Sequence, residues 1–225
     1  MKIAIVSDIH SNLEALLAVL KKIESEKVSK IYCLGDIVGY GPNPNECIDI
    51  IRSVSNNVVM GNHDSAVLGQ TSTALFNQYA KKSTEVTRKM LSDDNLQYLS
   101  TLPLQIKKES MLFTHATPKD PSKWNYLTTL GAAKENFLSF SEDICFIGHS
   151  HRSEVFRNHD GRLIINSGSV GQPRDGNSKA CFSIFDTETY KFQFLRVEYD
   201  LESVYMKIKK SELDNFLGER LFIGK

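Results

Sequence analysis

The sequence has few cysteines, and none of them lie close together. Its 225 residues include four, Cys33, Cys47, Cys145 and Cys181, and no C-x-x-C pair. A thiolate zinc site needs paired spacing, and disulfide-rich secreted domains need a higher cysteine content. Three of the four lie in apolar, strand-like runs, so we expect four reduced cysteines packed in the core.

The sequence also lacks an excess of charge and any long hydrophobic run. Lysine plus arginine and aspartate plus glutamate each number 27, so no overall basic field favours nucleic acid or an anionic membrane. No apolar stretch approaches a membrane span, and the N-terminus begins with strand-like residues 2–7 instead of the regions of a signal peptide. We expect a cytoplasmic protein with no nucleic-acid or membrane partner, and a homo-oligomer is compatible with the sequence.

The first sixty residues alternate between short apolar runs and helical periodicity. Residues 3–7, 31–36 and 58–60 predict buried strands. Leu13–Ile23 repeats apolar residues at helical spacing, and Pro44 suits the first turn of a second helix. This order predicts parallel strands with right-handed crossovers in an α/β fold.

A polar segment, residues 65–102, interrupts the alternation. Its apolar residues recur at helical intervals, which predicts two or three helices inserted after the third strand. Periodicity does not reveal where such an insert packs. An insert that covers the ligand site and one that packs away from it are both consistent with the sequence.

The remainder of the chain is predicted to be mostly β-structure. The predicted strands are residues 105–107, 111–114, 144–147, 154–157, 163–166, 181–186 and 191–197. A helix is predicted between Thr129 and Phe140, a hairpin turn at 158–161, and an amphipathic segment over 201–213. Without a repeat, linker or low-complexity tract, we expect one domain over residues 1–225.

Five of the predicted strands end in carboxylate, amide or imidazole side chains. The clusters are Asp8-Ile9-His10, Gly35-Asp36, Gly61-Asn62-His63-Asp64, Thr114-His115 and Gly148-His149-Ser150-His151. In extended chain, side chains two apart point the same way, so Asp8 with His10, and His149 with His151, can each converge on one point. His159 lies outside these clusters, and we expect it in a surface turn.

These donor types indicate metal binding. Imidazole and carboxylate without thiolate suit manganese, iron, nickel, zinc or cobalt. The clusters offer more ligands than one ion needs, and a carboxylate such as Asp36, at the end of a buried strand, can bridge two ions. Taken singly, Asp36 is better explained as a loop cap, and each histidine as a hydrogen-bonded core or loop residue. Five coincident strand ends favour the metal site.

In this order, the five clusters resemble the sequence blocks of the calcineurin-like metallophosphoesterases. The resemblance extends from Asp8 to His151 and implies a four-layer α/β sandwich, in which helices flank two mixed β-sheets. It implies that one metal ion is bound by Asp8, His10, Asp36 and His151. It implies that a second ion is bound by Asp36, Asn62, His115 and His149.

The same resemblance implies a metal-dependent phosphoesterase. Two divalent ions, with manganese expected first, would activate hydroxide for attack on a phosphoester. His63, backed by Asp64, would be the catalytic histidine that binds no metal. It could protonate the leaving oxygen, or stabilise the phosphoryl oxygens as a cation, and both roles remain open.

Two departures narrow the branch of the family. After Gly35-Asp36 the chain reads Ile-Val-Gly-Tyr-Gly-Pro, without the Asp-Arg-Gly element of phosphoprotein phosphatases and symmetrical dinucleotide hydrolases. The glycine-rich loop 166–176 is similar to a segment of small prokaryotic phosphoesterases, with Ser167 in place of the usual proline, so a less rigid loop is expected. Its Arg174 could contact a substrate phosphate or be an ordinary loop arginine.

We therefore expect small phosphorylated substrates. Nucleotides, dinucleoside polyphosphates cleaved in the asymmetrical manner, and simple phosphodiesters come before phosphoproteins and nucleic acids. Tyr40 or Tyr126 could stack on a base. The alternatives are a phosphoprotein phosphatase, a nuclease, which the neutral charge disfavours, and a catalytically weak scaffold on the same fold, which the complete set of metal-binding residue types disfavours.

Overall fold

The strand–helix–strand order at the N-terminus forms the parallel half of one β-sheet. The computed structural model describes residues 1–225, and its first three strands pair in parallel, as predicted. Two later strands extend the sheet in the antiparallel direction. The strands in spatial order are β10 (Lys191–Val197), β9 (Ala180–Asp186), β1 (Lys2–Val6), β2 (Lys30–Cys33) and β3 (Asn57–Val58).

The second sheet is also mixed and comes from the middle of the chain. Its strands in spatial order are β4 (Gln105–Lys108), β5 (Met111–Thr114), β6 (Ile144–Ile147), β8 (Leu163–Ser167) and β7 (Ser153–Arg157). The central pairs β5–β6 and β6–β8 are parallel, and the outer pairs are antiparallel. The predicted turn at 158–161 joins β7 to β8, and His159 is exposed there, as expected.

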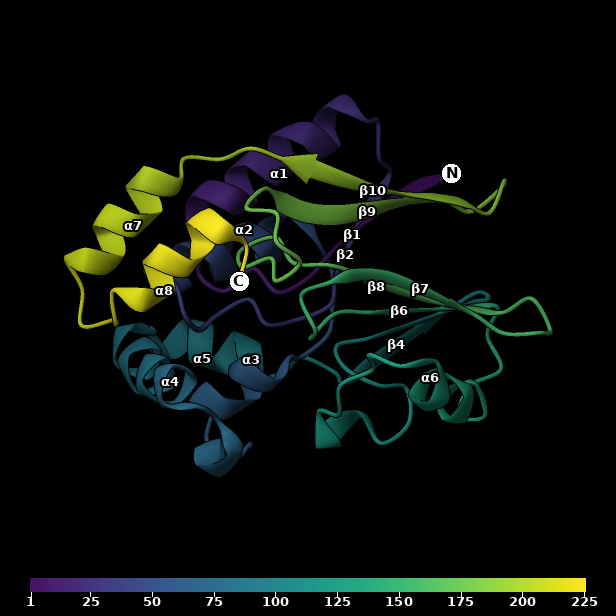
Figure 1. Cartoon of the computed structure of the whole chain (residues 1–225), viewed down its shortest axis with the longest axis horizontal. Coiled ribbons are helices and arrows are strands. Elements are labelled where there is room, and N and C mark those ends of the chain that lie inside the picture. Colours follow the sequence, from purple (N-terminus) through teal and green to yellow (C-terminus); the bar gives the residue numbers. More distant parts are fainter.

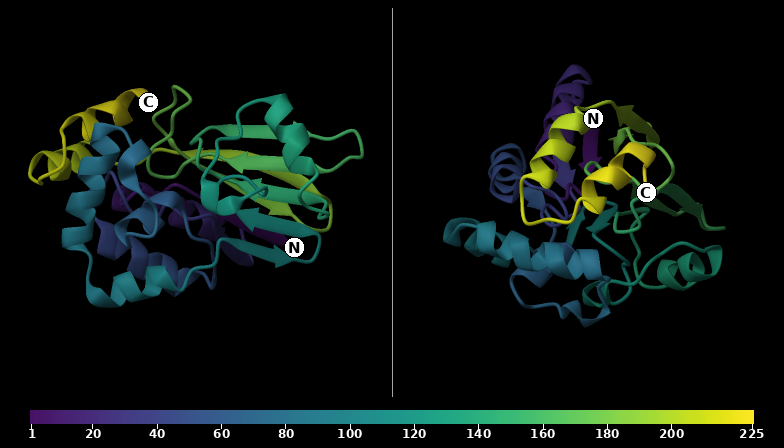
Figure 2. Two further views of the ribbon diagram at one scale, coloured as in Figure 1. Left: turned by 90° about the horizontal axis from the view of Figure 1, so that it is seen from below. Right: turned by 60° about the vertical axis from the view of Figure 1, so that its left-hand side comes forward.

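Helices cover the outer faces of both sheets and one end of the sandwich (Figure 1). The helices are α1 (Leu13–Ser25), α2 (Pro44–Val54), α3 (Asn62–Val67), α4 (Gln78–Met90), α5 (Asp93–Ser100), α6 (Leu130–Phe137), α7 (Leu201–Lys209) and α8 (Phe216–Glu219). Short 3₁₀ turns span Thr73–Leu75, Pro121–Lys123 and Arg220–Ile223. The helices α3 to α5 and α7 to α8 gather at the end of the sandwich away from the N-terminus (Figure 2).

Alternation along β1 explains why both of its faces are buried. Ile3 and Ile5 belong to the apolar layer between the two sheets, together with Phe113 and Phe146 of the second sheet. Ala4 and its neighbours on the same face pack against α1 and α2 in a separate apolar cluster. The structure therefore has the predicted layers, two mixed sheets face to face with helices outside.

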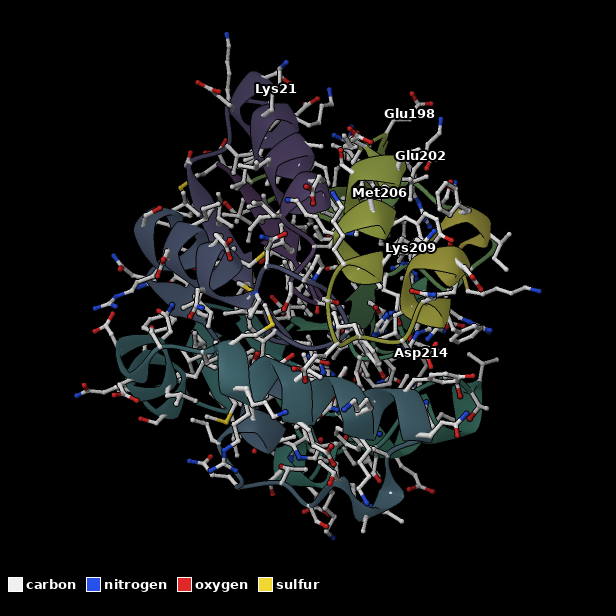
Figure 3. All side chains as sticks on the ribbon, turned by 90° about the vertical axis from the view of Figure 1, so that its left-hand side faces the viewer. Lys21, Glu198, Glu202, Met206, Lys209 and Asp214 are labelled. Atoms are coloured by element: carbon white, nitrogen blue, oxygen red, sulfur yellow. The ribbon has the colours of Figure 1, made fainter.

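The C-terminal helix α7 follows the predicted amphipathic pattern. Val204 and Ile208 are buried, whereas Glu202, Met206 and Lys209 are exposed. Figure 3 shows these three side chains on the outer face of the helix. No helix in the molecule combines the length and the hydrophobicity needed to cross a membrane.

Several boundaries differ from the predictions by one to three residues, most clearly near the polar clusters. β2 ends at Cys33, not at Asp36, and β3 covers Asn57–Val58 instead of 58–60. The end of β2 has a local reason: φ is 85° at Gly35 and 50° at Asp36, whereas β-strands require negative φ. All four cysteines are free and buried, as predicted.

Candidate metal centre and active-site cleft

The polar clusters meet because the strands that carry them are parallel. Asp8, Asp36 and Asn62 follow β1, β2 and β3, and these strands run in the same direction. His115 and His149 follow β5 and β6 of the second sheet, which are also parallel to each other. The carboxyl ends of both sets lie at the same end of the sandwich, so loops distant in sequence share one site.

The first group of donors consists of Asp8, His10, Asp36 and His151, whose ligand atoms all lie within 4.8 Å of one another. His10 Nε2 lies 3.1 Å from His151 Nε2 and 3.6 Å from Asp36 Oδ2. His151 Nε2 lies 3.3 Å from Asp8 Oδ1. All four side chains are buried.

The second group shares Asp36 with the first and adds His115 and His149. His115 Nε2 lies 3.3 Å from Asp36 Oδ2 and 3.2 Å from His149 Nδ1. The amide oxygen of Asn62 lies 3.0 Å from the same nitrogen. Asp36 is therefore the one carboxylate placed between both groups, where a bridging ligand would have to lie.

The hydrogen bonds of the imidazole rings show that acceptor atoms face each other. His10 Nδ1 donates to the Val38 carbonyl at 3.0 Å, and His151 Nδ1 donates to the Gln172 carbonyl at 2.6 Å. A neutral ring that donates through Nδ1 carries a lone pair on Nε2. The Nε2 atoms of His10 and His151, each with such a lone pair, lie 3.1 Å apart. Asp8 Oδ1 is buried without a hydrogen-bond donor. A cation among these atoms would satisfy all of them, so the residues present fit a divalent metal ion.

The protonation of the histidines agrees with this arrangement. Burial lowers the pKa of His10 and His151 well below the usual value, and it lowers the pKa of His149 to about 3. His115 differs: burial, the largest influence, acts to lower its pKa, but the charge of Asp36 and a hydrogen bond to it prevail and raise the pKa to about 9. A proton on His115 supplies positive charge that a metal ion would replace on binding.

The two carboxylates in the first group are each held at one oxygen, so that the other faces the donors. Asp36 Oδ1 accepts the His63 backbone N–H at 2.8 Å, and Asp8 Oδ2 accepts the His149 backbone N–H at 3.1 Å. Burial raises the pKa of Asp8 to about 6. Burial also acts on Asp36, but the neighbouring charge of His115 outweighs it and lowers its pKa. Asp36 is the fixed negative charge of the site.

The backbone at these residues is left-handed and not extended; Asp8 and His10 still share one group, as predicted, but the prediction for His149 and His151 is wrong. The φ angles are 53° at Asp8, 49° at His10, 50° at Asp36, 65° at His149 and 59° at His151. Such angles are uncommon outside glycine and cost energy that the surrounding structure must offset. Because of the turns, His149 and His151 do not converge on one point but belong to different groups. The family resemblance implies the same division, with His151 at one ion and His149 at the other.

Glycine is required where two of these loops touch. Gly35 has a φ of 85°, and a Cβ atom there would lie 2.4 Å from the Gly61 nitrogen. A Cβ atom on Gly61 would lie 2.2 Å from Asp36 Oδ1. Side chains at either position would push the Asp36 loop away from the Asn62 loop.

His63 lies beside the first group without belonging to it. Its ring centroid lies 5.0 Å from that of His10, 4.5 Å from that of Tyr40 and 5.0 Å from that of Phe76. Burial lowers the pKa of His63 to about 4, and its Nδ1 has no hydrogen-bond partner. The ring is therefore neutral and keeps one nitrogen without a hydrogen bond to the protein.

Asp64 differs from the prediction that it backs the His63 ring. Its Oδ1 accepts the backbone N–H groups of Ile37 at 2.9 Å and Val38 at 3.2 Å, and its Oδ2 accepts that of Gly61 at 3.0 Å. The carboxylate is thus engaged by three amides and makes no hydrogen bond to the imidazole. Asp64 ties the loop after β2 to the start of α3, because its side chain points back into the protein from the first turn of that helix.

Arg174 lies at the rim of the same site. Its Nε and Nη2 donate to Gln172 Oε1 at 3.1 and 2.7 Å, and its guanidinium carbon lies 5.7 Å from the centre of the Tyr40 ring. After burial, the charge of Arg174 is the next influence that lowers the pKa of His151. Tyr40 itself is buried between His10 and this arginine and cannot stack on a base.

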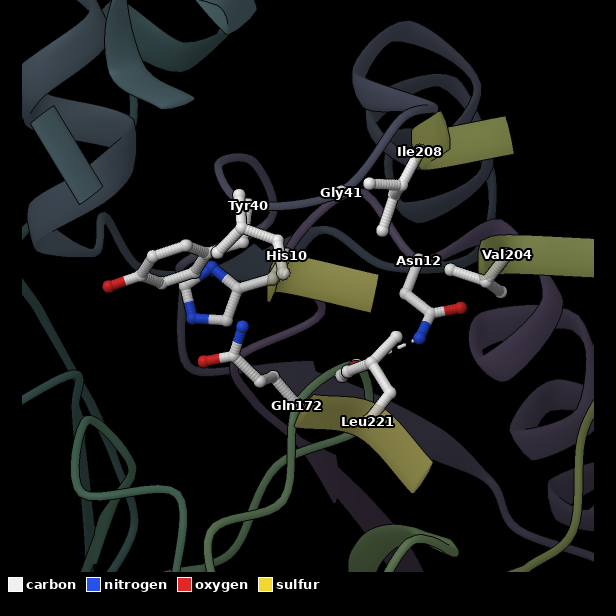
Figure 4. A pocket seen from close by; sticks show the side chains of 10 residues that line it. His10, Asn12, Tyr40, Gly41, Gln172, Val204, Ile208 and Leu221 are labelled. Atoms are coloured by element: carbon white, nitrogen blue, oxygen red, sulfur yellow. Dashed lines mark hydrogen bonds between the residues drawn. The ribbon is translucent and has the colours of Figure 1, made fainter. Parts of the chain in front are cut away.

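The C-terminal helices close the rear of the site. Figure 4 shows His10, Tyr40 and Gln172 on one side of a pocket and the apolar side chain of Val204 on the other, with Leu221 between them. These residues line a small cavity, whose other lining residues are Asn12, Gly41, Gly171, Ile208 and Leu217.

The loop that carries Arg174 is joined to the first sheet. Ser167, at the position where proline was expected, forms a hydroxyl–hydroxyl hydrogen bond of 2.9 Å with Ser183 of β9, and both are buried. This bond links β8 in one sheet to β9 in the other. The serine thereby gains a cross-sheet contact that proline could not make.

An open cleft of about 450 Å³ leads from the donors to the surface. Its floor is formed by Tyr40, Asn62, His63 and His149. One wall is the segment 71–80, which includes the start of α4, and the other is the loop 123–126. Part of the helical segment after β3 therefore lines the cleft. The sequence did not determine whether this segment covers the ligand site or packs away from it.

The walls contain functional candidates that the sequence analysis missed. Phe76 contacts His63, and Trp124 lies with its ring centroid 6.0 Å from that of His115. Tyr126 stacks on His149 with centroids 4.1 Å apart, so one of the two tyrosines considered for base stacking is well placed. The available signal was two aromatic residues, one of them the only tryptophan, in the polar loop 118–126.

Comparisons with known proteins agree with the fold. A model described as a calcineurin-like phosphoesterase superfamily domain matches residues 1–190. An uncharacterized protein of Methanocaldococcus jannaschii is 44% identical, over 99% of this chain and 98% of its own length. The crystal structure of a metallophosphoesterase from Sphaerobacter thermophilus is 36% identical with a TM-score of 0.88, over 100% of this chain and 99% of that one. A symmetrical bis(5'-nucleosyl)-tetraphosphatase of Baumannia cicadellinicola is 29% identical over 58% of this chain and 46% of its own length.

Proposed function

This chain belongs to the calcineurin-like phosphoesterase superfamily, and from that premise we propose that it hydrolyses small phosphoesters with two divalent metal ions. The observation that carries the proposal is that the unprotonated Nε2 atoms of His10 and His151 face each other at 3.1 Å. Neutral side chains would not approach in this way without a cation to share. Asn62 and His149 of the second donor group line the floor of an open cleft, where a substrate can reach them.

The proposed ligands of one ion are Asp8, His10, Asp36 and His151, and those of the other are Asp36, Asn62, His115 and His149. Manganese is the first candidate, and iron, nickel, zinc and cobalt fit the same nitrogen and oxygen donors. Two such ions would polarise the phosphoryl oxygens and lower the pKa of a bound water.

The proposed role of His63 is to hold or deliver a proton at the leaving oxygen. The residue lines the cleft next to the first donor group, and its neutral ring has one N–H to donate. Asp36 orients His63 from behind by accepting its backbone N–H. Arg174, held by Gln172 at the rim, is the proposed contact for a further phosphate oxygen.

The proposed substrates are nucleotides, dinucleoside polyphosphates and simple phosphodiesters. The match to symmetrical tetraphosphatases supports the dinucleotide class but covers only part of either chain. The chain also lacks the Asp-Arg-Gly element after Gly35-Asp36, so we propose asymmetrical cleavage of a dinucleoside tetraphosphate.

Metal analysis of the purified protein, combined with hydrolysis assays, tests this function. We expect about two equivalents of transition metal, and turnover of p-nitrophenyl phosphate, bis-p-nitrophenyl phosphate or diadenosine tetraphosphate that chelation abolishes and Mn²⁺ restores. The products of the tetraphosphate, ATP plus AMP or two ADP, distinguish asymmetrical from symmetrical cleavage. Absence of turnover on all three substrates with Mn²⁺ bound would refute the proposed function.

A further inference from the structure

The walls of the cleft have a composition suited to one kind of ligand. Three aromatic side chains, Phe76, Trp124 and Tyr126, lie on the walls, and no carboxylate lines the cleft. The only cationic side chain among the lining residues is Lys123. Its volume of about 450 Å³ falls within the range of small-molecule sites. Because Lys123 is paired with Asp120 at 3.0 Å, the aromatic side chains define the preference of the walls, which is for a flat apolar group.

Tyr126 has the geometry of a stacking platform. One face of its ring lies on His149, with centroids 4.1 Å apart and an angle of 20° between the planes. The side chain is nevertheless 56% exposed. His149 covers one face of the ring, and the outer face is available to a ligand bound over the donors.

Trp124 is fixed across the cleft by a hydrogen bond between the walls. Its Nε1 donates to Thr71 Oγ1 at 2.9 Å, and Thr71 shares a hydrogen bond of 2.7 Å with the Ser65 hydroxyl of α3. Its backbone is left-handed, with a φ of 54°. This conformation is unfavourable for a bulky residue and persists where the surroundings impose it.

We propose that this cleft binds the aromatic base of a nucleotide substrate, stacked on Tyr126 and flanked by Trp124 and Phe76. The inference rests on the proposed function in one respect, because the phosphate of the ligand would lie at the donors on the floor. Stacked on Tyr126, the base would be held next to His149, with the Arg174 side of the site left for further phosphates. The substrate class is then nucleoside phosphates in preference to phosphoesters with aliphatic groups.

Binding of AMP and of ribose 5-phosphate to the purified, Mn²⁺-loaded protein tests the inference. The two ligands share a phosphate and a ribose, and only AMP has a base. We expect AMP to bind at least tenfold tighter by calorimetry and to quench the fluorescence of Trp124, the only tryptophan in the chain. Tyr126→Ala should weaken AMP binding roughly ten- to hundredfold, the range for loss of an aromatic–base stack, and should leave ribose 5-phosphate binding unchanged.

Two further variants separate stacking from general damage. Tyr126→Phe keeps the ring and should keep the preference for AMP. Tyr190→Ala removes another exposed tyrosine beyond the other end of β1, where Asp186 pairs with Lys2, and should behave like the unmodified protein. Equal affinity for the two ligands, AMP binding without a change in Trp124 fluorescence, or an undiminished preference in Tyr126→Ala would overturn the inference.

Phosphate release measured in parallel keeps the two proposals distinct. Hydrolysis of nitrophenyl phosphates without any preference for AMP would leave the phosphoesterase intact and refute the base site. Base-dependent binding without hydrolysis of any phosphoester would support the base site and refute the proposed function.

Discussion

The floor and the walls of the cleft are built in opposite ways. On the floor and behind it, the candidate metal donors are all buried, and His10, His115 and His151 each donate a ring N–H to a backbone carbonyl. On the walls, Leu75 is 99% exposed and Tyr126 is 56% exposed. The floor is held by main-chain carbonyls of the loops that follow β2 and β8, whereas the walls are held by a few side-chain contacts.

This difference suggests a division of labour. A metal centre tolerates little displacement of its ligands, and hydrogen bonds to backbone carbonyls fix both the tautomer and the orientation of each ring. The residues of a substrate-binding wall can be substituted without loss of the reaction at the metal centre. Substitutions on the floor should therefore affect all substrates, and substitutions at the rim should affect only those that extend beyond the metal ions.

Asp36→Asn should produce the largest effect. The new amide oxygen can still accept the His63 backbone N–H, so the fold should persist, but an NH₂ group replaces the oxygen that faces both donor groups. We expect loss of measurable activity on every substrate and a metal content of one ion or none.

The control is Asp49→Asn, an exposed carboxylate on α2, which should retain both ions. The assays are elemental analysis and steady-state turnover of the two variants side by side. Full occupancy by two metal ions in Asp36→Asn would remove the bridging assignment.

His63→Ala should be the next most damaging change, and it should depend on the substrate. Because the ring belongs to neither donor group, both ions should stay bound. Turnover of an ester with a poor leaving group should fall by roughly two to four orders of magnitude. A nitrophenyl ester, whose leaving group needs no proton, should suffer less.

Rates on both ester types, with His159→Ala as the matched exposed histidine, provide the measurement. If both esters lose activity to the same degree, His63 does not act on the leaving oxygen.

The floor was largely predictable from the sequence, and the walls were not. Asp8, Asp36, Asn62 and His149 each follow an apolar strand within two to four residues, and parallel strands must bring such ends together. His115 stands alone in its cluster, so its assignment needed the family resemblance. Positive φ angles were not predictable at Asp8 or at the other donors, because nothing in the residue types demands them.

The wall residues escaped prediction for a physical reason. Helical periodicity fixes which face of a segment is buried but not which part of the protein it packs against. Phe76 and Trp124 meet the site only through tertiary contacts, at His63 and at Thr71. Behind the floor, the sequence analysis singled out Asp64 but predicted the wrong contacts for its carboxylate.

Asp64→Asn tests the corrected role of that residue and should have a moderate effect. One amide oxygen cannot serve the backbone N–H groups of Ile37, Val38 and Gly61 from both sides as the carboxylate does. We expect the free energy of unfolding to fall by about 1–2 kcal/mol. That loss lowers the melting temperature by roughly 3–6 °C in a chain of this size.

Thermal unfolding of Asp64→Asn and of the Asp49→Asn control decides between the two roles. An unchanged melting temperature together with a large fall in kcat would show that Asp64 acts on the His63 ring after all.

Arg174→Ala should have the smallest effect, confined to long substrates. The guanidinium lies at the rim, held by Gln172 and next to Tyr40, and it contacts none of the donor atoms. A small nitrophenyl phosphodiester ends before this point, so its KM should change little. A dinucleoside tetraphosphate carries further phosphates, and loss of one charge-assisted contact should raise its KM roughly tenfold with a smaller change in kcat.

Steady-state kinetics on both substrates, with Arg157→Ala on the exposed face of β7 as control, measures the difference. An equal change in KM for the two substrates would show that the rim, like the floor, acts on every phosphoester and does not select among them.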